Sequence, residues 1–282
     1  MPELPEVETI RRQLNEVLIG KKIQHVEVLR EKSFGGEPGK LIGWEIERVE
    51  RKSKLIEIYF KGKKEVMIVH LKMTGQLVFV DGMKRVVGGH PTADWVSELP
   101  SKHTRVVVDF TDGSKLFFND MRVFGWMRMV DKGKYEREMR KTSPDVTEKE
   151  FSLEYLTKVL KKSGKAIKLV LMDQNMIGGV GNIYANDALY LAKVRPDRKA
   201  NSLSDVEIKS LLSSVREVIN KGIKYGGASA ANYVDTKGLG GTYQDHFLVY
   251  KKDGQRCKKC GEKIVKIKFS GRGTFYCPKC QK

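Results

Sequence analysis

Four cysteines near the C-terminal end form two Cys-x2-Cys pairs. They are Cys257, Cys260, Cys277 and Cys280, and a loop long enough for a β-hairpin joins the pairs. Two such knuckles suit the tetrahedral coordination of one Zn²⁺, and a closed set of four thiolates predicts a structural metal. Zinc would stabilise a tail that is too small to fold unaided. The arrangement favours a reducing compartment over a disulfide framework.

The chain carries a large excess of positive charge. Its 282 residues include 53 Lys and Arg against 35 Asp and Glu, a net charge of +18. This balance favours an extended polyanion, nucleic acid above all, as the partner, although lysine enrichment also occurs in proteins from hot environments. No apolar run reaches the roughly 18 residues that span a bilayer, and no signal peptide is evident. We therefore expect a soluble intracellular protein with no membrane association.

The first half of the sequence predicts one helix followed by a β-rich domain. From about Pro5 to Leu18 the apolar residues fall on one helical stripe. Short β-branched runs then alternate with turn signals, and the hairpin turns predict an antiparallel sandwich or barrel. The predicted strands are Leu55–Phe60, Val66–Leu71, Gln76–Val80, Arg105–Phe110 and Lys115–Asn119.

The second half of the sequence has helical patterns. Thr147 with Glu150, and Ser204 with Glu207, match capping boxes that precede apolar residues at helical spacing, and Gly226 or Gly227 would close the second helix. A charged, apolar-poor segment before them predicts a linker. The expected division is a catalytic domain at 1–130, a linker at 131–145, a helical domain at 146–244 and a zinc finger at 245–282.

The N-terminal residues predict an amine nucleophile. Removal of Met1 would leave Pro2 with a free secondary amine of pKa near ~8, partly unprotonated at neutral pH. Such an amine can attack an aldehyde-level carbon and form an iminium ion, and Glu3 and Glu6 would lie within a few ångströms of it. In the alternative interpretation, Pro5 and Glu6 merely begin a helix.

Three other segments have residues suited to nucleic acid. The glycine-rich 178–184 leads into a helical pattern, so Asn182 and backbone amides can face a phosphate, although a bare glycine turn is the alternative. Arg272 lies between two glycines of the predicted hairpin, where a guanidinium can bind a phosphate. Two strand ends, at 70–75 and 119–125, have apolar or basic residues that could wedge into a base stack, although such residues more often form core.

Together these motifs resemble the formamidopyrimidine-DNA glycosylase family from the first residue to the last. The start at 2–9, the segment 172–185 and the finger at 272–281 are similar to three family motifs in the right order. The resemblance implies an α+β fold: an N-terminal helix with an antiparallel β-sandwich, a helical helix-two-turns-helix domain and a β-hairpin zinc finger. It also implies a monomer with one Zn²⁺ and no nucleotide cofactor.

The resemblance also implies roles for individual residues. Pro2 would be the nucleophile on C1′ of the damaged nucleotide, Glu3 the acid–base group, and Glu6 a residue that orients both. Lys54 would be the catalytic lysine, and Arg272 would bind phosphate during strand cleavage. The implied DNA contacts are Met73, His103, Arg122, Phe124, Lys165, Lys168 and Asn182, with Lys165 or Lys162 replacing a basic residue where this chain has Ser163.

The activity that follows is excision of oxidised purines from damaged double-stranded DNA, then strand cleavage by β- and δ-elimination. We expect it in the cytoplasm, at the nucleoid of a bacterial-type cell. One departure concerns the lesion-covering loop, which usually reads Gly-Gly-Thr-Thr and here reads Gly-Gly-Ala-Ser-Ala-Ala-Asn at 226–232. The alternatives are an endonuclease VIII-type enzyme for oxidised pyrimidines and a non-catalytic zinc-ribbon protein that binds nucleic acid.

Overall fold

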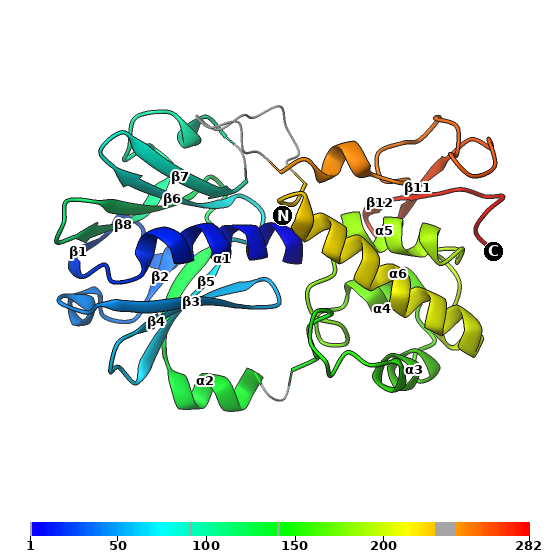
Figure 1. The fold of residues 1–282 in the computed structure, drawn as a ribbon, viewed down its shortest axis with the longest axis horizontal. Helices are drawn as coiled ribbons and strands as arrows, with labels where there is room; N and C mark the ends of the chain where they lie inside the picture. Colours follow the sequence, from blue (N-terminus) through cyan, green and yellow to red (C-terminus); the bar gives the residue numbers. More distant parts are fainter. Residues whose placement is uncertain (1, 91, 140–141, 229–240) are drawn as a thin grey trace. The chain divides into compact units, whose positions relative to one another are not determined.

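The computed structural model describes residues 2–90, 92–139, 142–228 and 241–282 (Figure 1). The chain forms two compact units. The first comprises Met1–Lys141 with Gly226–Thr242, and the second comprises Thr142–Tyr225 with Tyr243–Lys282. The helical part of the second half and the cysteine-bearing tail therefore form the second unit together. The segment Gly226–Thr242 belongs to the first unit.

The first unit is a sandwich of two five-stranded sheets, with strand orders β1-β8-β9-β6-β7 and β2-β10-β5-β4-β3. Among the described strands of this unit, neighbours pair antiparallel except β2 and β10, which pair in parallel. The strands are β1 Ile23–Val28, β2 Phe34–Gly35, β3 Ile46–Lys52, β4 Leu55–Phe60, β5 Glu65–His70, β6 Gly75–Asp81, β7 Lys84–Gly89, β8 Thr104–Phe110, β9 Lys115–Asp120 and β10 Trp126–Asp131. Short 3-10 helices cover Glu31–Ser33, Pro38–Leu41 and Ala93–Trp95.

The N-terminal helix α1 covers Leu4–Leu18 and is part of the sandwich core. Its apolar stripe is buried at every predicted position, against β3 and β4 of one sheet and β7 of the other (Figure 1). The predicted helix, the five predicted strands and the antiparallel sandwich are therefore confirmed. Gly88 on β7 permits this packing, because a Cβ there would lie 2.5 Å from Ile10 Cγ1.

The predicted linker contains a helix that its composition does not indicate. Helix α2 covers Lys132–Met139 and packs on the outer face of the sheet through Tyr135. The hydroxyls of Tyr135 and Tyr59 donate to the two oxygens of the buried Glu57 carboxylate. Burial raises the pKa of Glu57, and the two hydroxyls satisfy its oxygens, so part of this segment belongs to the first unit.

The second unit contains four α-helices and a hairpin. The elements are α3 Leu153–Lys161, α4 Ile167–Met172, α5 Asn182–Leu191, α6 Asp205–Lys224, β11 Val265–Phe269 and β12 Arg272–Tyr276, with 3-10 helices at Ala200–Ser202 and Tyr243–His246. The N-terminal half of the unit matches the predicted helical pattern, and β11 pairs with β12 as the predicted hairpin. None of the helices in the described residues is long and apolar enough to cross a membrane.

One of the two predicted capping boxes is confirmed. Ser204 Oγ accepts from Glu207 N at 3.3 Å at the start of α6, which ends before Gly226 at φ +70°. The box at Thr147 is wrong, because the Thr147 hydroxyl donates to Asp145 in a turn. Helix α3 begins instead after Ser152, whose hydroxyl accepts from Tyr155 N at 3.1 Å.

Candidate active site

The start of α1 holds the predicted nucleophile and its carboxylates in one turn. Pro2 is buried, and Glu3, at the N-cap, is 3% exposed. Glu6 reaches back across the first turn, where its Oε2 accepts from Glu3 N at 2.7 Å. This bond satisfies an amide that the helix cannot use and fixes the backbone beside Pro2. The sequence therefore places a buried carboxylate one residue from the amine that would react.

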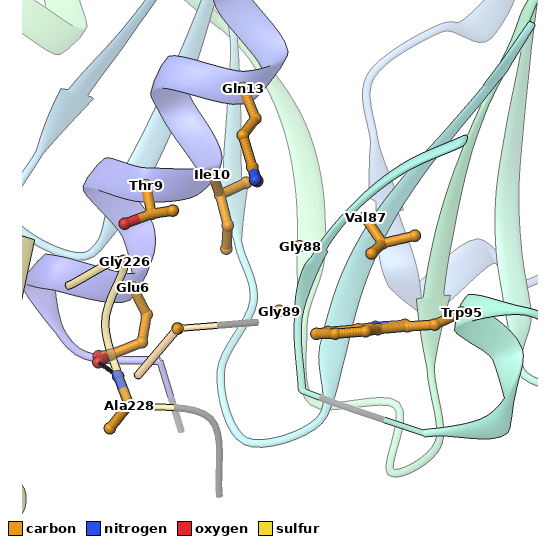
Figure 2. A pocket seen from close by; sticks show the side chains of 11 residues that line it. Glu6, Thr9, Ile10, Gln13, Val87, Gly88, Gly89, Trp95, Gly226 and Ala228 are labelled. Atoms are coloured by element: carbon orange, nitrogen blue, oxygen red, sulfur yellow. Dashed lines mark hydrogen bonds between the residues drawn. The ribbon is translucent and has the colours of Figure 1, made fainter. Parts of the chain in front are cut away.

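The other carboxylate oxygen of Glu6 holds the base of the long segment after α6. Glu6 Oε1 accepts from Ala228 N at 2.7 Å, as Figure 2 shows beside a small pocket. Gly227 makes this approach possible: its φ is +81°, and a Cβ there would lie 2.8 Å from Glu6 Cγ. Ala228 also pairs with Thr242 in an isolated bridge. The remaining residues of the predicted lesion-covering loop, 229–232, lie outside the described residues.

Lys54 lies in the two-residue loop between β3 and β4 and is 6% exposed. Arg51 connects this hairpin to α1, because its guanidinium bonds Glu8 Oε2 at 3.1 Å and donates to Ser53 O at 2.9 Å. Burial by itself raises the pKa of Glu8, but the guanidinium groups of three neighbouring arginines outweigh burial, and the pKa is lowered. These bonds fix the loop that carries Lys54 to α1, the helix that Pro2 and Glu3 precede.

His70, at the end of β5, has a neutral imidazole. Burial, followed by the positive charges of Lys72 and Lys54, lowers the pKa of His70 to about 3. Its Nδ1 accepts from Lys72 N at 3.1 Å, which fixes the ring as an acceptor at that nitrogen. The end of β5 therefore adds no positive charge beside the two lysines.

The predicted wedge residues are exposed at two neighbouring loops of the first unit. Met73, between β5 and β6, is 39% exposed, and Phe124, between β9 and β10, is 48% exposed. The guanidinium carbon of Arg122 lies 4.7 Å from the centroid of the Phe124 ring. Both loops line a pocket of about 360 Å³. The alternative prediction, that these side chains form core, is wrong.

His103 precedes β8 and is held by a carboxylate. Its Nδ1 lies 2.8 Å from Asp94 Oδ2. Although burial opposes ionisation of Asp94, hydrogen bonds from Ser101, Thr92 and His103 lower its pKa. The ionised Asp94 therefore orients the ring of the predicted DNA contact.

The four cysteines of the second unit converge. Their sulfur atoms all lie within 4.8 Å of one another, with Cys257 and Cys280 at 3.8 Å and Cys260 and Cys277 at 3.5 Å. These separations fit the thiolates of a tetrahedral Zn²⁺ site with Zn–S bonds of about 2.3 Å. The hydroxyl of Tyr190 on α5 lies 3.2 Å from Cys257 Sγ, so the adjoining helix supplies a bond to one ligand.

Two predicted DNA contacts of the helical domain hold the zinc-finger hairpin. Lys168 is 1% exposed, and its ammonium donates to Gly273 O at 3.2 Å and to Thr274 Oγ1 at 2.6 Å. Asn182 Nδ2, at the start of α5, donates to Gly273 O at 3.2 Å. These bonds fix the backbone next to Arg272, which is exposed at the first position of β12.

Lys165 differs from Lys168 in being exposed. Its ammonium lies 3.5 Å from Asp173 Oδ2, a surface ion pair. Ser163, at the position where a basic residue was expected, is buried. Of the lysines considered as DNA contacts in this region, Lys165 and Lys162 are the exposed ones.

Several buried polar residues that hold loops and the hairpin in place escaped the sequence analysis. Asp120 accepts bonds from the loop that presents Arg122 and Phe124. Asn186 Oδ1 accepts from Phe275 N at 2.8 Å, and the Asp187 carboxylate accepts from three amides at 248–250. Asp187 is fully buried, and burial raises its pKa. For Asn186 and Asp187, a polar residue inside an apolar helical pattern was the available signal, and Asp120 stands at the end of a strand.

Family models cover most of the chain. The model described as formamidopyrimidine-DNA glycosylase N-terminal domain matches residues 1–127, and the model of the H2TH domain of the same enzyme matches residues 142–233. A zinc finger found in FPG and IleRS matches residues 254–282, in agreement with the four converging cysteines. The predicted structural zinc is therefore confirmed.

Similar proteins agree over the full length. Two curated relatives are formamidopyrimidine-DNA glycosylases, from Listeria monocytogenes serotype 4b at 38% identity and from Pelotomaculum thermopropionicum at 36%. The alignments cover 100% of this chain and 100% and 99% of those proteins. Among solved structures, a complex of Lactococcus lactis Fpg with DNA containing an abasic site has a TM-score of 0.87, 32% identity and full coverage of both chains.

Proposed function

Because this chain belongs to the formamidopyrimidine-DNA glycosylase family, we propose that it excises oxidised purines from duplex DNA and then cleaves the strand at the abasic site. The match over all three parts of the chain carries this proposal. The alternative of a non-catalytic zinc-ribbon protein accounts only for the C-terminal residues. It does not account for the match of residues 1–127 to the N-terminal domain of the glycosylase. The relatives are bacterial, which supports action in the cytoplasm, at the nucleoid.

Pro2 performs the first step in this proposal. After Met1 is removed, the lone pair of its secondary amine attacks C1′ of the damaged nucleotide, and the glycosidic bond breaks with its electrons passing to the leaving base. The ammonium formed at Pro2 loses its proton, the C1′–O4′ bond opens, O4′ takes a proton, and an iminium ion joins Pro2 to the sugar. Glu3, buried one residue away, supplies and removes protons at the sugar.

Strand cleavage follows from the iminium ion. The cationic nitrogen acidifies C2′, so loss of a proton there expels the 3′ phosphate, and a second elimination expels the 5′ phosphate. Water then hydrolyses the remaining iminium ion and frees Pro2. Lys54 and Arg272 neutralise charge at the substrate phosphates, and Glu6 holds the backbone of Glu3 in place.

Extrusion of the damaged nucleotide precedes chemistry, because a glycosidic bond inside a duplex is inaccessible. Unstacking and unpairing cost a few kcal/mol, which wedge and phosphate contacts offset. Met73, Arg122 and Phe124 fill the vacated space. His103, Lys165 and Asn182 contact the phosphate backbone, and Lys168 acts through the hairpin to which it is bonded.

Lesion specificity separates this proposal from an endonuclease VIII-type enzyme. Relatives with the formamidopyrimidine name support oxidised purines. A solved structure of wild-type Lactococcus lactis Fpg, at 32% identity, contains DNA with an oxidised pyrimidine, so both lesion classes belong in the test.

The test is single-turnover excision by processed enzyme from matched duplexes containing 8-oxoguanine, a formamidopyrimidine, thymine glycol or no lesion. We expect the two purine lesions to be excised at least about tenfold faster than thymine glycol. Faster excision of thymine glycol would favour the pyrimidine enzyme. Absence of cleavage at every lesion would contradict the proposed function.

A further inference from the structure

Asp120, at the end of β9, is completely buried and holds the loop that follows it. Its Oδ2 accepts from Phe124 N at 2.7 Å and from Gly125 N at 2.6 Å, while Oδ1 accepts from Arg122 N at 3.1 Å. The Thr74 hydroxyl donates to Oδ1. One carboxylate thus replaces water for three amides of a surface loop.

These bonds impose an unusual backbone between the two exposed side chains. Val123 has φ +55°, in the left-handed region that β-branched residues rarely occupy. Gly125 lies so near the carboxylate that a Cβ would come within 3.1 Å of Asp120 Oδ2 and 2.9 Å of Phe118 Cζ. Without the carboxylate, Val123 would relax to a commoner conformation and redirect Arg122 and Phe124.

Thr74 links the second loop to the same carboxylate. It follows Met73, and its hydroxyl also accepts from Arg122 N at 3.1 Å. Gly75 N donates to Leu71 O at 2.8 Å, which closes the turn that presents Met73. Loops 71–75 and 121–125 are therefore fixed to each other through one buried pair, Thr74 and Asp120.

We infer that Asp120 and Thr74 are positioning residues for base extrusion, which hold Met73, Arg122 and Phe124 as one rigid wedge. The inference rests on the proposed function. Side chains that are already fixed lose little conformational entropy when they enter the duplex, so a larger share of their contact energy offsets unstacking. Both residues act through the loops and contact no substrate.

Two variants test the inference. Asp120→Asn keeps the size of the side chain. In either orientation of the asparagine, however, its NH2 group would face N–H or O–H donors and could accept no hydrogen bond from them. Thr74→Val removes the hydroxyl with little change in shape. Asp81→Asn and Thr111→Val, at exposed positions of the same sheet and its turns, are the matched controls.

The readout compares two substrates. One is a paired 8-oxoguanine duplex with 2-aminopurine beside the lesion, whose fluorescence reports unstacking. The other carries an abasic site inside an unpaired bubble, where extrusion is not needed, and is scored by borohydride trapping. We expect both positioning variants to slow excision from the paired duplex and the fluorescence change by about tenfold to a hundredfold, with trapping on the bubble within about threefold of wild type.

Equal losses on both substrates would overturn the inference, as would no loss on either. Thermal unfolding and zinc content are measured for each variant, and Thr74→Val carries the test if Asp120→Asn does not fold. Wild-type enzyme that cleaves neither substrate would instead contradict the proposed function. The two failures are thereby distinguished.

Discussion

Glu6 and Ala228 are joined by a hydrogen bond of 2.7 Å across 222 positions of sequence. The same carboxylate accepts from Glu3 N through its other oxygen. One side chain therefore connects the residue beside the proposed nucleophile to the base of the segment that corresponds to the lesion-covering loop. We therefore expect Glu6 to couple the position of the nucleophile to the backbone at Ala228.

Glu6→Gln tests this coupling. A glutamine side chain has one acceptor oxygen, so its NH2 group must face the backbone N–H of either Glu3 or Ala228 and break that hydrogen bond. We expect excision of 8-oxoguanine to fall roughly ten- to a hundredfold, corresponding to a loss of about 1–3 kcal/mol. Single-turnover kinetics measure the effect. A Glu6→Gln enzyme with wild-type excision and trapping rates would refute the coupling.

Gly227→Ala tests the close approach of the backbone at Gly227 to the side chain of Glu6. An added Cβ would lie 2.8 Å from Glu6 Cγ, whereas the control Gly62→Ala has a similar positive φ and no atom within 4 Å. Both variants carry the strain of positive φ, of order 1 kcal/mol. Only Gly227→Ala is expected to slow excision, by about tenfold or more. Equal excision rates in the two variants would contradict the packing argument.

Lys168→Met and Lys165→Met separate a structural lysine from a surface lysine. Loss of the buried Lys168 ammonium removes the donor to Thr274 Oγ1 and leaves Gly273 O with Asn182 Nδ2 as its donor, so we expect destabilisation by about 1–3 kcal/mol and weaker strand cleavage. Lys165→Met should change stability by less than about 0.5 kcal/mol, because exposed ion pairs contribute little. It should instead lower the salt dependence of DNA binding by roughly one phosphate contact. Denaturant unfolding and salt titrations measure both.

The lowered pKa of His70 predicts that the folded protein loses stability as the pH falls. In the unfolded chain its imidazole takes up a proton near pH ~6.5, whereas in the folded protein burial and two lysines lower the pKa to about 3. The unfolded state binds more protons between these values, so the contribution of neutral His70 to stability is complete above about pH 6.5 and is lost as pH falls toward 3. His70→Gln should flatten the fall in stability between pH 7 and 5. Parallel curves for wild type and His70→Gln would contradict the assignment.

Much of the fold follows from local patterns. The stripe of α1 and the β-branched runs of β4 and β5 have the right period, and the cysteine spacing indicates the finger. Strand β3 was missed because Ile46 and Val49 are separated by two charged residues, a spacing that suits a helix rather than a regular strand, and the structure accommodates it with a register shift between Ile46 and Arg48. Helix α2 was missed because its main anchor, Tyr135, bonds a distant buried carboxylate.

The site was predictable where its residues are close in sequence and unpredictable where they are not. Pro2, Glu3 and Glu6 lie within five residues of sequence at the start of α1. The pairing of Thr74 with Asp120, 46 positions apart, depends on the register of β6 with β9. Burial of Lys168 was also unforeseen, since lysines are almost never fully buried without polar partners, and its partners come from the hairpin more than 100 positions away.

The central claim is that the amine of Pro2 bonds to the damaged sugar, and borohydride trapping tests it most directly. Processed enzyme is mixed with an 8-oxoguanine duplex and reduced, and the adduct is digested and mapped by mass spectrometry. The account predicts one stable cross-link, on the peptide that begins with Pro2, and none with Pro2→Gly or with a tag left on the N-terminus. Strand cleavage by processed enzyme with the cross-link on a lysine, or with no cross-link at all, would contradict the account.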